Sequence, residues 1–429
     1  MTVEPAPQKA PGWVSASRSG AVVSVVMLSL GEVLALIGMA SLHLEFSLGE
    51  TLRLGTFYLW LFHRGSVVWS ISAEGAAVNA QVYVSAAFMA GTFLALWLLF
   101  RAGARSAGGG GLLSRGLNGA RVAPAYAALS LAAVALLSGD GETARVVLFP
   151  GIVQVLVFAA VAGFAGGVMT TRETLPEGRQ RRVLAVVMGA WGMLAYGIAA
   201  SFIALMLLAG LKPAYSRVYL AGFRAVRQSG GAAALVNNAM LLPNESVWAM
   251  SASMGACNGI YGSVNVDVLC YSHFPTGLST PTDQAVPVPT TVPRIPLALL
   301  VFIAVPPAAV LLGATTGERF ARTRSHREAA LIGATSGLVF SPLMGLAALF
   351  AGVGLRYVGS GPLQGQAVFI GPDVLMSALV TAAWGVAGGA LGAMASRRFR
   401  RGGEGLVVDH AGDDEDPADQ PDPADDDAR

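Results

Sequence analysis

Long apolar blocks alternate with short arginine-rich segments along most of this chain. A helix needs about 20 apolar residues to cross the hydrocarbon of a bilayer, and the apolar blocks approach or exceed that length. We count eight such blocks: 20–42, 82–100, 122–138, 146–169, 183–210, 295–314, 329–355 and 373–396. The pattern predicts an all-α integral membrane protein with about eight transmembrane helices.

The basic residues fall in every second loop. Arginines cluster in 101–121, 172–182, 319–327 and 397–401, and Lys9 and Arg18 precede the first block. Because short cytoplasmic loops of membrane proteins are enriched in Lys and Arg, we expect both termini to be cytoplasmic and the chain to lie in the plasma membrane. The first block is too long for an ordinary signal peptide, so we interpret it as a retained span.

Two of the alternate, external loops are long, 43–81 and 211–294. Each holds a semi-apolar stretch, GTFYLWLF at 55–62 and GGAAALVNNAMLL at 230–242. Irregular backbone is allowed at membrane depth where protein buries it. We therefore expect extra half-helices or re-entrant segments in these two loops.

The two long loops also contain similar motifs. VWSISAE at 68–74 has its Trp69, Ser72 and Glu74 in the first loop, and VWAMSAS at 247–253 has Trp248 in the second. Each motif follows the first span of a four-span group, which is the arrangement of a parallel repeat. One interpretation is a 4+4 duplication with halves 20–182 and 183–396; the other is that Trp and small residues simply recur at membrane interfaces.

A polar interruption precedes the second motif. It contains Asn237, Asn238, Pro243, Asn244 and Glu245. Proline disfavours helix in the residue before it, while Asn at an N-cap and Glu in a first turn favour a new helix. The stretch predicts a helix, a break and a second helix, serving either as a binding site, as in some transporters, or as a packing element.

Three further residues are candidates for a role. Glu32 lies in the middle of the first block, where a carboxylate is costly and faces a partner or water; it is either a cation- or proton-coupled site or a packing acid. Cys257 and Cys270 are the only cysteines. Outside the cytoplasm they either form a disulfide or are small buried residues.

Composition excludes most catalytic classes. The chain is 54% hydrophobic and 13% charged, half the charge of a soluble domain. Its five His are far apart, without zinc-ligand spacing or a hydrolase motif, and the glycine run 108–111 lacks the Lys-Ser/Thr of a phosphate loop. We therefore expect no enzyme activity, no metal, no cofactor and no nucleic-acid partner.

The C-terminal segment differs sharply from the rest. Residues 409–427 contain nine Asp and one Glu, too polar to fold alone. We divide the chain into a cytoplasmic tail 1–19, a membrane domain 20–396 and a basic, then acidic, disordered tail 397–429. The acidic part either keeps this end solvated or docks a basic cytosolic partner, and the basic part contacts lipid headgroups.

The arrangement of spans, together with the stretches 65–75 and 243–255, resembles multi-spanning membrane proteins of actinobacteria. It is similar to the streptophobe family and, more distantly, to the cell-division membrane protein PerM. The resemblance to PerM implies a non-enzymatic scaffold or regulator in envelope and division processes, with the bilayer and other membrane or division proteins as partners. The alternative is a permease or lipid translocator that uses Glu32 and the break near Pro243.

Overall fold

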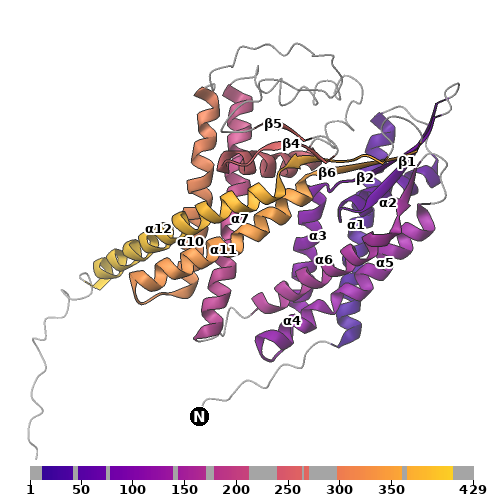
Figure 1. Ribbon diagram of the computed structural model, residues 1–429. Coiled ribbons are helices and arrows are strands. Elements are labelled where there is room, and N and C mark those ends of the chain that lie inside the picture. Colours follow the sequence, from indigo (N-terminus) through magenta and orange to yellow (C-terminus); the bar gives the residue numbers. More distant parts are fainter. Residues whose placement is uncertain are drawn as a thin grey trace, which may run out of the picture.

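The computed structural model describes residues 12–41, 47–73, 78–138, 144–170, 178–211, 239–262, 265–269, 297–359 and 365–408 (Figure 1). Seven helical segments in this part of the chain are long and apolar enough to cross a membrane: 13–40, 112–137, 151–169, 179–208, 301–321, 326–351 and 374–399. The protein is thus mostly helical and multi-pass, which confirms the prediction at that level.

The first half of the molecule, as we use the term, contains six helices and three strands. They are α1 (Trp13–Ser41), α2 (Leu48–Leu61), β1 (Ser66–Ala73), β2 (Val78–Ser85), α3 (Met89–Ser106), α4 (Leu112–Ala120), α5 (Val122–Leu137), β3 (Ala144–Val147) and α6 (Leu148–Met169). Ser47 caps the short α2, because its Oγ accepts from the Glu50 N–H at 3.1 Å and donates to the Glu50 carboxylate at 2.9 Å.

The second half follows a similar order, with two strands, β6 and β7, where the first half has β3 alone, and with no counterpart of α4. It comprises α7 (Arg179–Leu211), a helix over 239–254 that we call the junction helix, β4 (Asn258–Gly262), β5 (Val266–Leu269), the 3₁₀ turn η1 (Leu297–Ala304), α10 (Val305–Ala321), α11 (His326–Ala351), β6 (Val353–Gly359), β7 (Ala367–Pro372) and α12 (Val374–Val408).

All seven strands join one antiparallel sheet at one end of the helices. The strand order is β3-β1-β2-β6-β7-β4-β5. The first half contributes β3-β1-β2, and the second half contributes β7-β4-β5 in the matching order. Strand β6 lies between them, pairing with β2 from Ala80↔Gly359 to Ser85↔Gly354 and with β7 on its other side.

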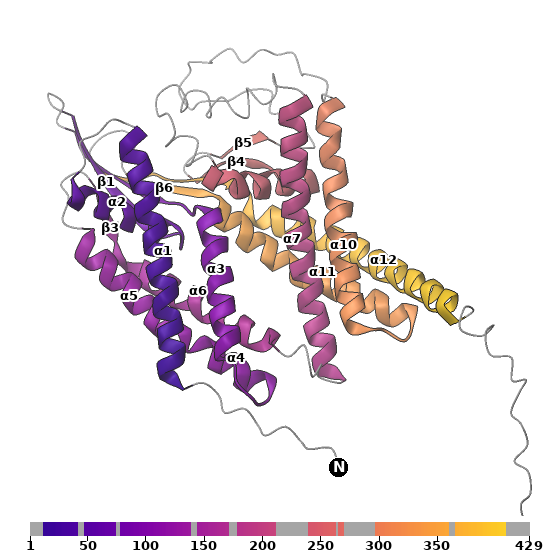
Figure 2. The ribbon, with the colours of Figure 1, turned by 180° about the vertical axis from the view of Figure 1, so that it is seen from behind.

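Helix contacts in the two halves also correspond. In the first half α1 packs on α5, and α6 packs on α3 and α5; in the second half α7 packs on α11, and α12 packs on α10 and α11. Figure 2 shows the two groups of helices from behind, with the strands crossing from one to the other.

Each half has its own core. One buried cluster draws on α1, α2, α3, α5 and α6, and contains Trp60, Phe62 and Tyr126. The other draws mainly on α7, the junction helix, α10 and α11, and contains Met193 and Met250. Met89, at the start of α3, belongs to the second cluster, so the cores meet beside the junction helix.

Glycines permit close helix contacts. A methyl group on Gly337 of α11 would overlap the backbone of Gly385 on α12, and one on Gly333 would overlap Gly389. In the first half Gly103 of α3 lies equally close to Gly163 of α6. The small residues thus let helix backbones approach directly, as they do in other membrane proteins.

The structure differs from the prediction in three respects. The predicted span 82–100 is shifted, because 78–85 form β2 and α3 covers 89–106, an 18-residue helix that carries Arg101 and Arg105. The sheet was not predicted: β1, β4 and β5 lie in the two long loops for which only half-helices were expected, and β3, β6 and β7 lie at or between the ends of predicted spans. The tail predicted to be disordered from 397 is helical to Val408, where it continues α12; residues 409–429 lie outside the described part.

Candidate functional site

The junction helix connects the two halves through Asn244. This side chain is 4% exposed. Its Oδ1 accepts from the Met89 N–H at 3.1 Å, and its Nδ2 donates to the carbonyls of Ala87 at 2.7 Å and Ala351 at 3.2 Å. The first two partners open α3 in the first half, and the third ends α11 in the second. One buried amide therefore satisfies three backbone groups from two bundles.

Two further contacts lie at the same junction. Trp248 Nε1 donates to the same Ala351 carbonyl at 3.0 Å. The guanidinium of Arg64, in the turn after α2, lies 5.9 Å from the ring centroids of both Phe350 and Phe369, in the second half. The junction therefore combines hydrogen bonds with cation–π contacts.

The predicted helix break at Pro243 is wrong. Residues 239–254 are continuously helical, so Asn244 does not cap a new helix and instead points into the junction. Proline removes one backbone hydrogen bond from a helix, and the tertiary contacts of this helix, those of Asn244 among them, outweigh that cost. Asn237 and Asn238 lie outside the described residues.

The proposed equivalence of the two Val-Trp motifs is also wrong. Trp69 and Ser72 lie in strand β1, whereas Trp248 lies in the junction helix; Glu74 is outside the described residues. By order in the chain and in the sheet, β1 corresponds to β4, which begins after the second motif has ended. A seven-residue similarity across a strand and a helix is therefore a coincidence of composition.

Glu245, beside Asn244, is partly buried on the junction helix. Burial raises the pKa of its carboxyl to about 7, because a partly desolvated acid favours its neutral form. Further along, Cys257 is disulfide-bonded, and Cys270 lies outside the described residues.

The carboxyl of Glu32, a half-buried residue of α1, is enclosed against α2. A methyl group on Gly55 would overlap the Glu32 carboxyl, and one on Gly31 would overlap the Gly55 carbonyl. Both carboxyl oxygens are inaccessible and have no hydrogen-bond partner. Gly55 thus provides the space in which α1 and α2 enclose this acid. The structure does not bring it together with Asn244, which lies at the junction.

A buried polar chain in the first half was missed by the sequence analysis. His63 Nδ1 lies 2.9 Å from the Leu59 carbonyl, which makes Nδ1 the donor, so Nε2 accepts from the Tyr126 hydroxyl at 2.6 Å. Ser130 continues the chain beside Tyr126, and its hydroxyl lies 3.0 Å from that of Ser24. The chain links the turn after α2 with α5 and α1.

His63 is 1% exposed, and burial lowers its pKa to about 4, so the ring is neutral at physiological pH. In the sequence this residue is a lone His after a semi-apolar stretch. Only the fold brings it to Tyr126, 63 positions later, and no motif spacing indicates that contact.

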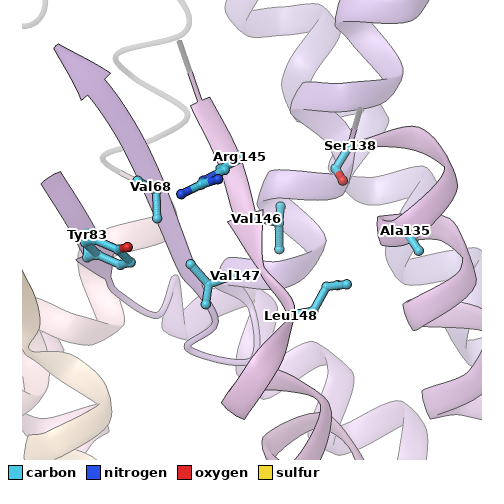
Figure 3. Close-up of a pocket in the computed structure, with 8 residues that line it drawn as sticks. All are labelled: Val68, Tyr83, Ala135, Ser138, Arg145, Val146, Val147 and Leu148. Carbon is cyan, nitrogen blue, oxygen red and sulfur yellow. The ribbon is translucent and has the colours of Figure 1, made fainter. Parts of the chain in front are cut away.

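A pocket opens where β1, β2 and β3 meet the end of α5. It encloses about 460 Å³ and is lined by Val68, Tyr83, Ala135, Ser138, Arg145, Val146, Val147 and Leu148. We call it the sheet pocket; Figure 3 shows Arg145 lying over β1 beside Val68. Its chemistry is mixed, with one guanidinium and two hydroxyls among aliphatic walls.

Charged groups are buried at the end of the second half that lies away from the sheet. Glu318 accepts from Thr323 at 3.1 Å and from Ser396 at 3.3 Å. Arg397, 2% exposed, donates to the Arg324 carbonyl. These contacts fasten the loop between α10 and α11 to α12.

Within the described residues, no three His, Cys, Asp or Glu side chains gather closely enough to hold a metal ion. No family model, curated protein or solved structure matches the chain.

Proposed function

We propose that this protein is a non-enzymatic scaffold or regulator of the cell envelope, which acts by presenting its sheet to other membrane or division proteins. The observation that supports this most directly is the pairing of β2 with β6. Six consecutive residue pairs join a strand of the first half to a strand of the second. Together with the three hydrogen bonds of Asn244, this pairing favours a fixed relation between the halves.

Transport is less favoured by the same contacts. Alternating access requires one bundle to rock or gate against another around a central site. Such a movement would break ladder hydrogen bonds and strip Asn244 of its partners at a buried position, each lost partner costing about 1–3 kcal/mol. The enclosed Glu32, covered by Gly55, is better explained as a packing acid than as a transported ion's site.

We further propose that the halves are a parallel 4+4 repeat with the membrane spans α1, α3, α5, α6 and α7, α10, α11, α12. Matching strand orders, β3-β1-β2 and β7-β4-β5, and matching helix contacts support it. The described arginine-rich segments 101–121, 179–182 and 319–327 lie at the end opposite the sheet. The positive-inside rule then orients the sheet outward, with both termini cytoplasmic in the plasma membrane. A reporter fused after Arg401 should report the cytoplasm.

The function is tested by capture from native membranes. Val358 lies on β6 in the same face as Arg356 and is 39% exposed; Leu379, 56% exposed on α12, is the lipid-facing control. A photoreactive amino acid at Val358 should crosslink a discrete protein, and one at Leu379 should not. Equal capture at both positions, or none at Val358, contradicts the proposal.

Locking the halves separates scaffold from permease. Val82 and Tyr357 are directly opposed on β2 and β6, a pair whose separation suits a disulfide. Oxidised V82C/Y357C should capture the same partner through position 358 as the reduced protein. If capture disappears on oxidation while the fold persists, function requires the halves to move, and the permease becomes the better explanation.

The acidic tail is tested separately. Removing residues 409–427 should release a basic cytosolic partner from the purified complex, if the tail docks one. Retention of every partner would leave solvation as its role.

A further inference from the structure

We propose that the sheet pocket binds the anionic phosphate headgroup of a membrane lipid. The site goes beyond the proposed scaffold function and does not depend on it. Its volume, about 460 Å³, falls within the usual range of ligand pockets, about 300–1,000 Å³.

The polar groups of the pocket suit a phosphate. Val68 on the central strand pairs with Arg145 of β3 on one side and with Tyr83 of β2 on the other. Side chains of directly paired residues point to the same face, so the guanidinium and the phenol flank Val68. Ser138, at the end of α5, adds a second hydroxyl. Arginine binds phosphate with two parallel hydrogen bonds.

Arg145 is available for this role. It is exposed, and its hydrogen bond within the described residues is a long one, 3.5 Å from Nη2 to Gln81 Oε1. Such a bond is easily exchanged for a charge-assisted bond to an anion.

The surroundings favour a lipid over a soluble phosphate compound. Leu136, at the end of α5, is 80% exposed, and Phe149, at the start of α6, is 74% exposed. Both flank residues that line the pocket, and both helices belong to segments apolar enough to span a membrane. A phosphate on Arg145 would thus lie at the bilayer surface, with acyl chains beside Leu136 and Phe149.

Titration of the purified full-length protein, followed by native mass spectrometry, tests the site. The probes are phosphatidylglycerol, uncharged diacylglycerol and inorganic phosphate. Phosphatidylglycerol should bind at one saturable site, and R145Q should weaken that binding about tenfold, as expected for a lost hydrogen bond to a charged group. R356Q is the matched control: Arg356 is exposed and pairs with Tyr83 from the far side, and its loss should leave the affinity unchanged.

A second pair of variants tests the cavity without changing charge. Ala135 lines the pocket, and Ala132 is exposed one turn earlier on the same helix. A135W should reduce phosphatidylglycerol binding and A132W should not. Equal loss in R145Q and R356Q, or no effect of A135W, overturns the site. If inorganic phosphate binds as tightly as phosphatidylglycerol, the ligand is not a lipid. If diacylglycerol binds as tightly, the site does not recognise the phosphate.

Discussion

The two halves share a layout and differ in what fills them. Elements, helix contacts and strand orders correspond. Yet the first core holds Trp60, His63 and Tyr126 around a buried polar chain, whereas the second is rich in methionine, including Met193, Met250 and Met344. The comparison shows that this arrangement of helices and strands does not require one particular interior. A polar chain fixes specific partners, while methionine adapts to irregular space.

The junction should be the most sensitive place in the molecule, because neither half holds it alone. N244A removes one amide and leaves the Met89 N–H and the Ala87 carbonyl without that partner, whereas the Ala351 carbonyl keeps the Trp248 indole. At about 1–3 kcal/mol per unsatisfied group, the free energy of unfolding should fall by about 2 kcal/mol or more. Thermal unfolding in detergent measures it.

Asn118 provides the matched control, since it is buried and its hydrogen bond within the described residues stays in the first half, to the Ala107 carbonyl at 3.0 Å. N118A should cost about 1–3 kcal/mol. With a protease site inserted in 171–177, the cut halves of N118A should stay together and those of N244A should separate. Halves of N244A that remain associated would show that the sheet and the contacts of Arg64 and Met89 suffice to join them.

Acid should weaken the first half in particular. His63 has a pKa of about 4 in the folded protein, against 6.5 for an ordinary histidine. Between these values the unfolded chain binds the extra proton, so stability is complete above pH 6.5 and falls as the pH drops toward 4. The loss should reach about 3 kcal/mol at most.

H63Q tests this assignment, because glutamine does not titrate in that range and keeps polar atoms near Tyr126. Unfolding midpoints followed from pH 7 to 4 should fall less steeply in H63Q than in the natural protein. Parallel slopes would mean that other groups cause the acid sensitivity.

Conservative substitutions should distinguish the two interiors. Y126F keeps the ring but leaves His63 Nε2 without its donor at 2.6 Å, which should cost about 1–3 kcal/mol. M193L in the second core should cost less than about 1.5 kcal/mol, as volume-conserving swaps usually do. Similar losses in both variants would contradict the difference drawn between the halves.

The membrane-spanning helices could be predicted from the sequence, but the contacts that join the two halves could not. Spans such as 183–210 could be predicted because hydrocarbon thickness sets their length and the arginine loops bound them. The sheet could not, since it is completed only when segments far apart in the chain meet at one end of the bundle, as where β2 pairs with β6. In the sequence Asn244 stands out as a possible helix cap, which is a local role. Its hydrogen-bond partners instead lie 155 and 107 positions away. The role of His63 could not be predicted either, because its partner Tyr126 lies on another helix.

Glu245 offers the smallest and most local test, on the helix that joins the halves. Its folded pKa of about 7 lies above the ordinary 4.5, so the folded state retains a proton that the unfolded chain has released. The carboxyl therefore costs no stability below pH 4.5, and the free energy of unfolding falls as the pH rises toward and through 7. E245Q cannot ionise, so between pH 4.5 and pH 8 its free energy of unfolding should rise relative to that of the natural protein. The difference should be smaller than the His63 effect, because water partly screens the side chain. If the stability of E245Q and the natural protein differs by the same amount at pH 4.5 and pH 8, the carboxyl is not desolvated and the junction is wetter than the rest of the second half.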